Sequence, residues 1–177
     1  GHEHSHGEAA AAFWDQPILG SGLHRAHRDG WPDLVDGHEA ARAGETLSMD
    51  QAVDISESLR QAAIAYSEAV YYARADVFED LCHDKFQMTH ITPDGATFWD
   101  KAAYLERVRG RNPYEGQAAY EILSMDQAGG EIARVHLTVD VPPLRYEDHL
   151  GFVRVDGAWK LLTKVFRTAA HLDDGAM

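Results

Sequence analysis

The chain has 177 residues, of which 45% are hydrophobic and 25% are charged, which suits one globular domain with a substantial core. Its formal net charge is −13, so we expect no nucleic-acid partner, because phosphates are contacted by Lys and Arg. The sequence has no basic patch for anionic lipid and no apolar run near the ~20 residues that span a bilayer, so we expect no membrane partner either.

Residues 1–45 are predicted to form an N-terminal arm outside the main domain. His2, His4 and His6 open it, and such a tract either binds a metal ion or is a plain tail. Apolar anchors such as Trp14 recur between glycines and prolines, so we expect the arm to pack across the domain or onto a second subunit. The single cysteine, Cys82, is compatible with a cytoplasmic protein. Because the chain begins at Gly1, an exported protein whose signal peptide has been removed is the alternative.

The region from Thr46 to Ala75 predicts a long helix. Ser48 suits the N-cap, and Gln51 three residues later completes a capping-box pattern. Apolar residues then recur at steps of three and four and form one buried stripe that includes Tyr66. Tyr66 is therefore either a core tyrosine or a hydroxyl in a pocket.

A second helix and a first strand follow. Asp76 to His83 predicts the short helix, and Phe86 to Ile91 predicts the strand, on which Phe86, Met88 and His90 share a face. Because Phe86 and Met88 are apolar, we expect that face, with His90, to point inward.

A third helix is predicted from Asp100 to Arg109, with Phe98 and Trp99 at its start. Four strands are predicted after it, at residues 118–125, 131–141, 146–155 and 159–167. The Asp156-Gly157 pair between the last two is a strong hairpin signal, because a tight turn needs positive φ.

Short connections require these four strands to pair antiparallel in sequence order. On the last strand we expect Trp159 and Leu161 to face away from Lys164 and Phe166, with one face on the helices and the other on a partner subunit. The whole order predicts an α+β domain over residues 46–177, with helices packed on one face of a bent sheet.

The stretch from Ser48 to Arg167 resembles the nuclear transport factor 2-like (NTF2-like) superfamily. The resemblance lies in the long helix with Tyr66, in His83-Asp84 leading into the first strand, and in the closing hairpin from Tyr146 to Phe166. That hairpin resembles the branch called "putative lumazine-binding", which is polyketide-cyclase-like (SnoaL-like). The resemblance implies a cone, with a curved antiparallel sheet wrapped on three N-terminal helices, an apolar conical pocket and a homodimer.

The resemblance also implies a range of functions, because the superfamily holds isomerases, cyclases, dehydratases, epoxide hydrolases and binders without chemistry. We expect a small-molecule-binding protein, either an isomerase, dehydratase or cyclase that needs no cofactor, or a non-catalytic ligand-binding module. A third alternative is a dimeric structural domain whose pocket is filled by its own side chains.

The expected catalytic residues are His90, His149 and Tyr66. By the resemblance His90 takes the position of the isomerases' carboxylate base, and histidine can serve as a general base. Gly151 lies near the place of their neutral acid and has no side chain to donate. His149, two residues earlier, is expected to point into the cone, with Asp148 pointing the other way.

Apolar and aromatic side chains are expected to line the substrate pocket. The predicted set is Phe86, Met88, Phe98, Trp99 and Trp159. A zinc site at His90 and His149 would need a third ligand, and none is evident, so we assign no metal and no cofactor.

Overall fold

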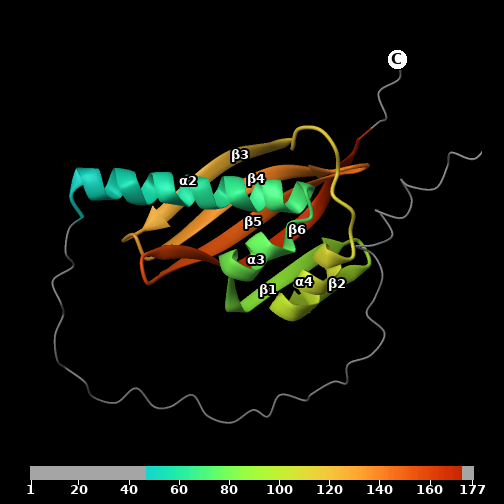
Figure 1. Ribbon diagram of the computed structural model, residues 1–177, viewed down its shortest axis with the longest axis horizontal. Helices are drawn as coiled ribbons and strands as arrows, with labels where there is room; N and C mark the ends of the chain where they lie inside the picture. The colour runs from blue at the N-terminus through green and yellow to red at the C-terminus, as the bar shows by residue number, and fades with distance from the viewer. Residues whose placement is uncertain (1–46, 173–177) are drawn as a thin grey trace, which may run out of the picture.

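The structure, a computed structural model, describes residues 47–172. These residues form three helices and six strands (Figure 1). In chain order they are α2 (Met49–Tyr71), α3 (Ala75–Leu81), β1 (Cys82–Thr92), β2 (Gly95–Asp100), α4 (Lys101–Arg109), β3 (Tyr120–Ala128), β4 (Ile132–Val141), β5 (Leu144–Val155) and β6 (Ala158–His171). The predicted arm, residues 1–45, lies outside the described residues.

The six strands form one sheet in the order β2-β1-β6-β5-β4-β3. All neighbours are antiparallel except β1 and β6, which are parallel. The predicted α+β fold with three helices is confirmed. The prediction of a purely antiparallel sheet is wrong, because β1 and β6 are parallel. Short connections fix the direction only of strands that follow each other, and β1 and β6 are far apart in the chain.

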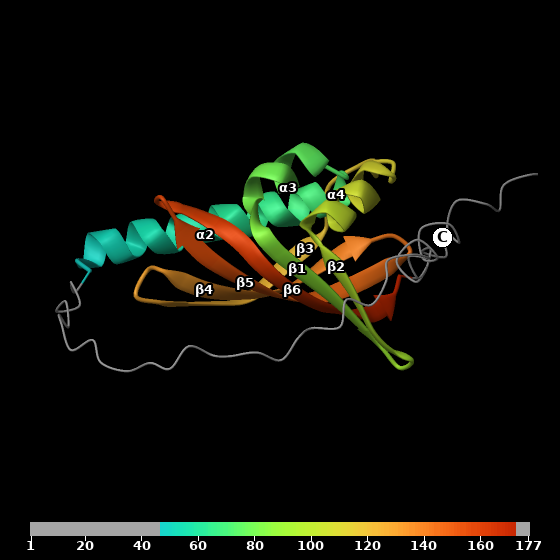
Figure 2. The ribbon, with the colours of Figure 1, turned by 90° about the horizontal axis from the view of Figure 1, so that it is seen from below.

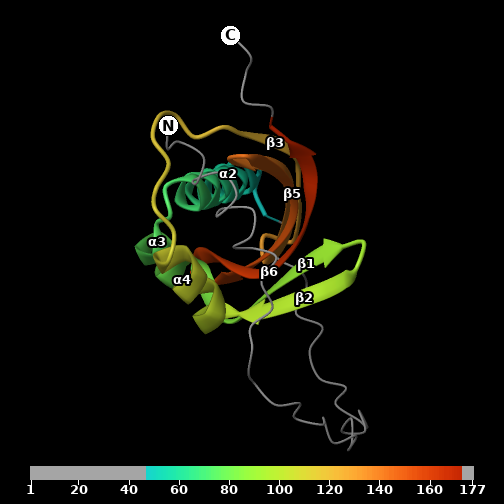
Figure 3. The same cartoon turned by 90° about the vertical axis from the view of Figure 1, so that its right-hand side faces the viewer.

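The sheet is curved and its concave side holds the helices. In Figure 3 the strands from β3 to β6 bend round α2, which lies inside the curve. Figure 2 shows α3 and α4 on the same side of the sheet, with the β1–β2 hairpin projecting past the other strands. This arrangement makes the concave face the place where side chains from the helices and the strands meet.

Local sequence signals explain how α2, α4 and the last hairpin begin or turn. The Ser48 hydroxyl accepts from the Gln51 backbone N–H, and the Gln51 side chain accepts from the Ser48 N–H, so the predicted capping box is present. The Asp100 carboxylate caps α4 by accepting from the Ala103 N–H at 2.9 Å. Asp156 and Gly157 both have positive φ, as the hairpin prediction required.

Strand β2 was not predicted. Phe98 and Trp99 belong to it rather than to the start of a helix, and it pairs antiparallel with β1. Its six residues lie between a turn and the Asp100 cap, and so short an apolar run carries too little periodicity to separate strand from helix. The correction places Phe98 and Trp99 on opposite faces of an edge strand.

A β-bulge in β6 changes which face its side chains occupy. Gly151 is paired with Thr163 and Phe152 with Leu161, so Leu162 is the extra residue. Trp159 and Leu161 before it, and Lys164 and Phe166 after it, are therefore all buried. The prediction that the two pairs face opposite sides is wrong, because one extra residue shifts the alternation by one.

No helix among residues 47–172 is both long enough and apolar enough to cross a membrane.

Candidate functional site

The inner face of β5 is set by alternation along the strand. Its buried side chains are Leu144, Tyr146, Asp148, Leu150 and Phe152, whereas His149 is exposed. Asp148 therefore faces the concave side and His149 the convex side, which is the reverse of the prediction. The signal was present in the sequence, because Tyr146, Leu150 and Phe152 are the larger apolar set and carry Asp148 with them.

Asp148 is the centre of a buried polar group that we name the Asp148 cluster, made of Asp148, Tyr66 and Lys164. The Tyr66 hydroxyl donates to Asp148 Oδ2 at 2.5 Å, and Lys164 Nζ lies 3.5 Å from the same oxygen. The side chain of Lys164 is 4% exposed and that of Asp148 is 0% exposed. The other carboxylate oxygen, Oδ1, is buried and accepts no hydrogen bond from any residue that the structure describes.

Burial controls the protonation of this cluster. Burial, reinforced by the negative charge of Asp148, raises the pKa of Tyr66 well above its ordinary value. Burial also lowers the pKa of Lys164, although the Asp148 carboxylate opposes that shift. The Tyr66 phenol consequently stays protonated across the physiological range and remains a donor to Asp148.

Aromatic rings surround the Lys164 ammonium. Lys164 Nζ lies 4.4 Å from the ring centre of Phe166, 5.3 Å from that of Tyr66 and 5.7 Å from that of Tyr104. These contacts favour the charged form of the lysine, since the faces of aromatic rings attract cations. Tyr104, from α4, is also buried, and burial raises its pKa well above the ordinary value.

His90 lies in the same cross-strand row as Asp148. His90 on β1 is paired with Phe166 on β6, and Phe166 is paired with Asp148 on β5. The His90 ring stacks on the Phe166 ring with centres 4.3 Å apart, and His90 is 2% exposed. The predicted inward orientation of His90 is confirmed, and two strand spacings of about 5 Å each separate its backbone from that of Asp148.

Three of the five predicted lining residues lie on the concave side of β1 and β2. Phe86, Met88 and Trp99 are buried, and Met88 is paired both with Trp99 and with Lys164. Trp159 is buried at the other end of β6, where its indole N–H donates to Ser58 Oγ of α2 at 3.0 Å. The structure therefore brings Phe86, Met88 and Trp99 toward the Asp148 cluster and keeps Trp159 away from it.

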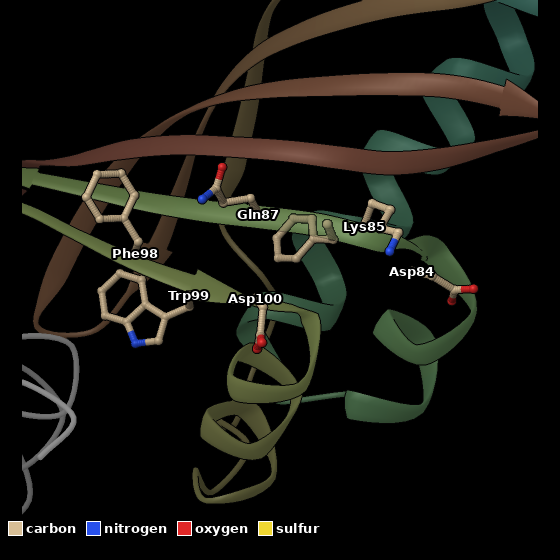
Figure 4. A pocket seen from close by; sticks show the side chains of 7 residues that line it. Asp84, Lys85, Gln87, Phe98, Trp99 and Asp100 are labelled. Carbon is tan, nitrogen blue, oxygen red and sulfur yellow. The ribbon is translucent and has the colours of Figure 1, made fainter. Parts of the chain in front are cut away.

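Phe98 does not line the concave face. It is 60% exposed and borders a depression of about 430 Å³ at the β1–β2 edge of the sheet. Figure 4 shows Phe98 and Trp99 pointing to opposite sides of β2, with Gln87 on the same side as Phe98. The alternation of β2, which was not predicted as a strand, explains the error.

On the convex face His149 forms a separate surface group with its neighbours on β4 and β5. Its ring stacks on that of His136, with centres 4.3 Å apart, and His136 Nε2 lies 2.8 Å from Glu147 Oε1. Arg167 also pairs with Glu147, at 2.6 Å. His149 is thus on the opposite side of the sheet from His90, and the two cannot act on one molecule.

Arg111, just after α4, adds a second cation near the cluster. Its Nη2 donates to the Val70 carbonyl oxygen, and Val70 follows Tyr66 by one turn of α2. Burial lowers the pKa of Arg111, whereas Tyr104 and Tyr114 act to raise it. Nothing in the sequence marks this arginine, because it lies in a connection whose path depends on the packing of α4 against α2.

Two other kinds of site, a metal centre and a cysteine nucleophile, can be compared with the described residues. Within residues 47–172 no group of three or more His, Cys, Asp and Glu side chains is placed to hold a metal ion. The thiol of Cys82 is buried, and burial raises its pKa to about 12, so it is a poor nucleophile.

Solved structures with a similar fold include several NTF2-like proteins. One is an NTF2-like protein of unknown function from Silicibacter pomeroyi DSS-3, with a TM-score of 0.61 at 19% identity over 66% of this chain and 98% of that one. A putative scytalone dehydratase from Novosphingobium aromaticivorans DSM 12444 has a TM-score of 0.56 at 16% identity, over 73% of this chain and 94% of that one.

A ketosteroid isomerase-like protein from Erwinia carotovora atroseptica SCRI1043 has a TM-score of 0.53 at 18% identity, over 64% of this chain and 95% of that one. At these identities the likeness shows the fold, which is the cone that the sequence resemblance implied. A search of curated proteins finds no match.

The sequence also matches a protein family over residues 54–167, which is well over half of the chain and includes most of α2, the Asp148 cluster and His90. The chain therefore has the fold of these NTF2-like structures and belongs to the family described as "Putative lumazine-binding".

Proposed function

We propose that this protein binds a small, flat organic molecule on the concave face of its sheet, with the Asp148 cluster holding the polar atoms of that molecule. One observation carries the proposal: Asp148 is fully buried, and its Oδ1 accepts no hydrogen bond from the described residues. A buried acceptor left in this state costs free energy, so an N–H or O–H donor from a ligand would stabilise it.

The surroundings of the cluster favour a flat and mostly apolar ligand. Phe86, Met88, Tyr104 and Phe166 are buried around it and offer apolar and aromatic surface. The family description names lumazine, a flat bicyclic compound that carries both N–H and C=O groups. Such a molecule could donate to Asp148 Oδ1 and stack on the aromatic rings.

A titration with lumazine, followed by its fluorescence, tests the proposal. We expect saturable binding, and we expect Asp148→Asn to weaken it about 10- to 100-fold, the usual effect of losing a hydrogen bond to a charged group. Asp126→Asn is the matched control, because Asp126 is exposed and pairs with Arg134 at the surface. Circular dichroism confirms folding of each variant.

Absence of binding by lumazine, together with a ligand-free mass in native mass spectrometry, would contradict the proposal. It would favour the structural alternative, in which the concave face is filled by the chain itself.

A catalytic role is the second candidate, and the row that links His90 to Asp148 favours it. In this form the protein is a cofactor-independent isomerase, dehydratase or cyclase. His90 would remove a proton beside a carbonyl group of the substrate, while the Asp148 cluster, including Tyr66, orients that substrate.

The catalytic proposal predicts that His90→Gln lowers kcat by about 10²- to 10⁴-fold, the usual contribution of a general base. His171→Gln, an exposed histidine at the end of β6, serves as the control. Unchanged turnover in folded His90→Gln protein would remove His90 from the mechanism and leave the binding proposal standing.

We further propose that the protein is a homodimer. Apolar side chains on the convex face support this, since Val165 is 46% exposed and Ile132 is 57% exposed. Sedimentation velocity over a range of concentrations tests it, and a monomer at all concentrations would contradict it.

A further inference from the structure

The amine of Lys164 lies in surroundings that stabilise a positively charged nitrogen. Its Nζ is 3.5 Å from Asp148 Oδ2, and the same oxygen accepts the Tyr66 hydroxyl at 2.5 Å. The ring centres of Phe166, Tyr66 and Tyr104 lie 4.4 Å, 5.3 Å and 5.7 Å from Nζ. A carboxylate and the faces of aromatic rings both attract a cation, so this place suits an ammonium group or any other cationic nitrogen.

Burial gives the same amine the reactivity of a nucleophile. The Lys164 side chain is 4% exposed, and burial lowers the pKa of this lysine, although the Asp148 carboxylate acts to raise it. A lower pKa leaves a larger fraction of the lysine as neutral amine, which is the form that attacks a carbonyl carbon. Buried lysines are for this reason the ones that form imines with aldehydes and ketones.

We propose that Lys164 forms an imine with an aromatic aldehyde or ketone bound on the concave face. This inference rests on the proposed binding function and adds a covalent bond to it. The protonated imine keeps a positive charge on the nitrogen, so Asp148 and the aromatic rings stabilise it as they stabilise the ammonium group. Met88, which is paired with Lys164, and Phe86 on the same face of β1 are buried and offer apolar surface to the ring of the ligand.

Asp148 can carry the protons that this reaction moves. The carboxylate takes one proton from the Lys164 ammonium, and the neutral amine adds to the carbonyl carbon, so that a C–N bond forms. A proton passes from nitrogen to the former carbonyl oxygen. Asp148 then returns its proton to that oxygen, the C–O bond breaks, water leaves and the nitrogen lone pair forms the C=N bond.

The sum of these steps is balanced. One ammonium group and one carbonyl group give one protonated imine and one water molecule, and the carboxylate is regenerated. Asp148 Oδ1, which accepts no hydrogen bond from the described residues, is the oxygen open to the transient proton. Tyr66 meanwhile holds the other oxygen of the carboxylate in place.

Reductive trapping tests the proposal on the full chain. The probe is 2-naphthaldehyde with sodium cyanoborohydride, which reduces an imine to a stable secondary amine, and peptide mass spectrometry locates the added naphthylmethyl group. At pH 7 we expect at least about tenfold more adduct on Lys164 than on the exposed Lys85, because each unit by which burial lowers a pKa enlarges the amine fraction about tenfold. Equal labelling of the two lysines would overturn the proposal.

A non-reactive analogue separates this inference from the proposed binding function. 2-Naphthalenemethanol has nearly the same shape as the aldehyde and forms no imine, and its binding is followed by fluorescence. Absence of the Lys164 adduct in protein that binds this alcohol or lumazine would overturn the imine and leave the binding function intact. Absence of the adduct in protein that binds neither compound would overturn both.

Variants identify the groups that act. Lys164→Arg keeps the positive charge and cannot form an imine, so the fast first adduct seen in the intact mass should disappear, whereas Lys85→Arg, the matched control, should retain it. Asp148→Asn should slow formation of this adduct about 10²-fold, the usual contribution of a proton-transfer group. Circular dichroism confirms folding, and an unchanged first adduct in folded Lys164→Arg protein would overturn the assignment. If that variant does not fold, the peptide map of the unchanged protein decides.

Discussion

Asp148 illustrates how the alternation of side chains along a strand can bury a carboxylate. Its chain neighbours Glu147 and His149 are polar, which suggests a surface position, yet Asp148 is 0% exposed and is held by Tyr66 and Lys164. The arrangement is costly in isolation, because each buried charge loses its hydration. That cost is the physical reason to associate the cluster with binding rather than with stability alone.

Removing one partner of the buried Asp148–Lys164 pair should lower the free energy of unfolding more than replacing both partners. We expect Asp148→Ala to lower the free energy of unfolding by about 3–5 kcal/mol, because it leaves Lys164 buried without its carboxylate. The double variant Asp148→Leu with Lys164→Met should lose less than the single one, since no charge is then buried. Urea denaturation, followed by circular dichroism, measures the free energy of unfolding of the unchanged protein and of both variants.

A surface pair provides the comparison for that experiment. Asp126 and Arg134 lie 3.3 Å apart with both side chains largely exposed, so Asp126→Ala should cost less than about 1 kcal/mol. A double variant as unstable as Asp148→Ala would show that the ion pair itself is net stabilising and contradict this account.

At the scale of single elements, the bulge in β6 decides which residues reach the concave face. Without Leu162 as an extra residue, Lys164 and Phe166 would point to the convex side, away from Asp148 and His90. The bulge lies where Gly151 of β5 is paired with Thr163, and a Cβ atom built on Gly151 would lie 2.4 Å from Thr163 Oγ1. A glycine at position 151 thus lets the two strands approach at this point.

Gly151→Ala should therefore destabilise the domain by about 1–3 kcal/mol, the usual cost of overpacking. The double variant Gly151→Ala with Thr163→Ala should recover most of this loss, because Thr163→Ala removes the clashing hydroxyl. Thermal unfolding of the single variants and the double variant gives the comparison. Full stability of Gly151→Ala alone would show that Thr163 moves aside freely and that the contact imposes no constraint.

Across the whole molecule, three buried acidic groups predict how stability depends on pH. Burial raises the pKa of the Cys82 thiol to about 12 and raises those of Tyr66 and Tyr104 well above the ordinary tyrosine value. In the unfolded chain the same groups lose their protons from about pH 9 to 10 upward. The unfolded state then binds fewer protons than the native state, so stability falls as the pH rises through this range.

We expect the free energy of unfolding to be insensitive to these groups below about pH 8 and to decrease above pH 10, by up to about 1.4 kcal/mol per pH unit for each group. Denaturant titrations between pH 7 and pH 11 measure this dependence. Tyr104→Phe and Cys82→Ala each remove one titrating group, so each should flatten the alkaline slope. A slope that neither variant changes would assign the alkaline loss of stability to other groups.

The sequence by itself determined the helices, the last four strands, the capping box of α2, the Asp156-Gly157 turn and the inward orientation of His90. These features depend on short-range periodicity and turn chemistry, which neighbouring residues encode. Only the tertiary structure decided the parallel pairing of β1 with β6, the strand β2 and the bulge at Leu162. Tyr66, Lys164 and Asp148 come together through contacts between residues far apart in the chain. Local propensity cannot specify such contacts, because it contains no information on strand register or on the path of the chain between elements.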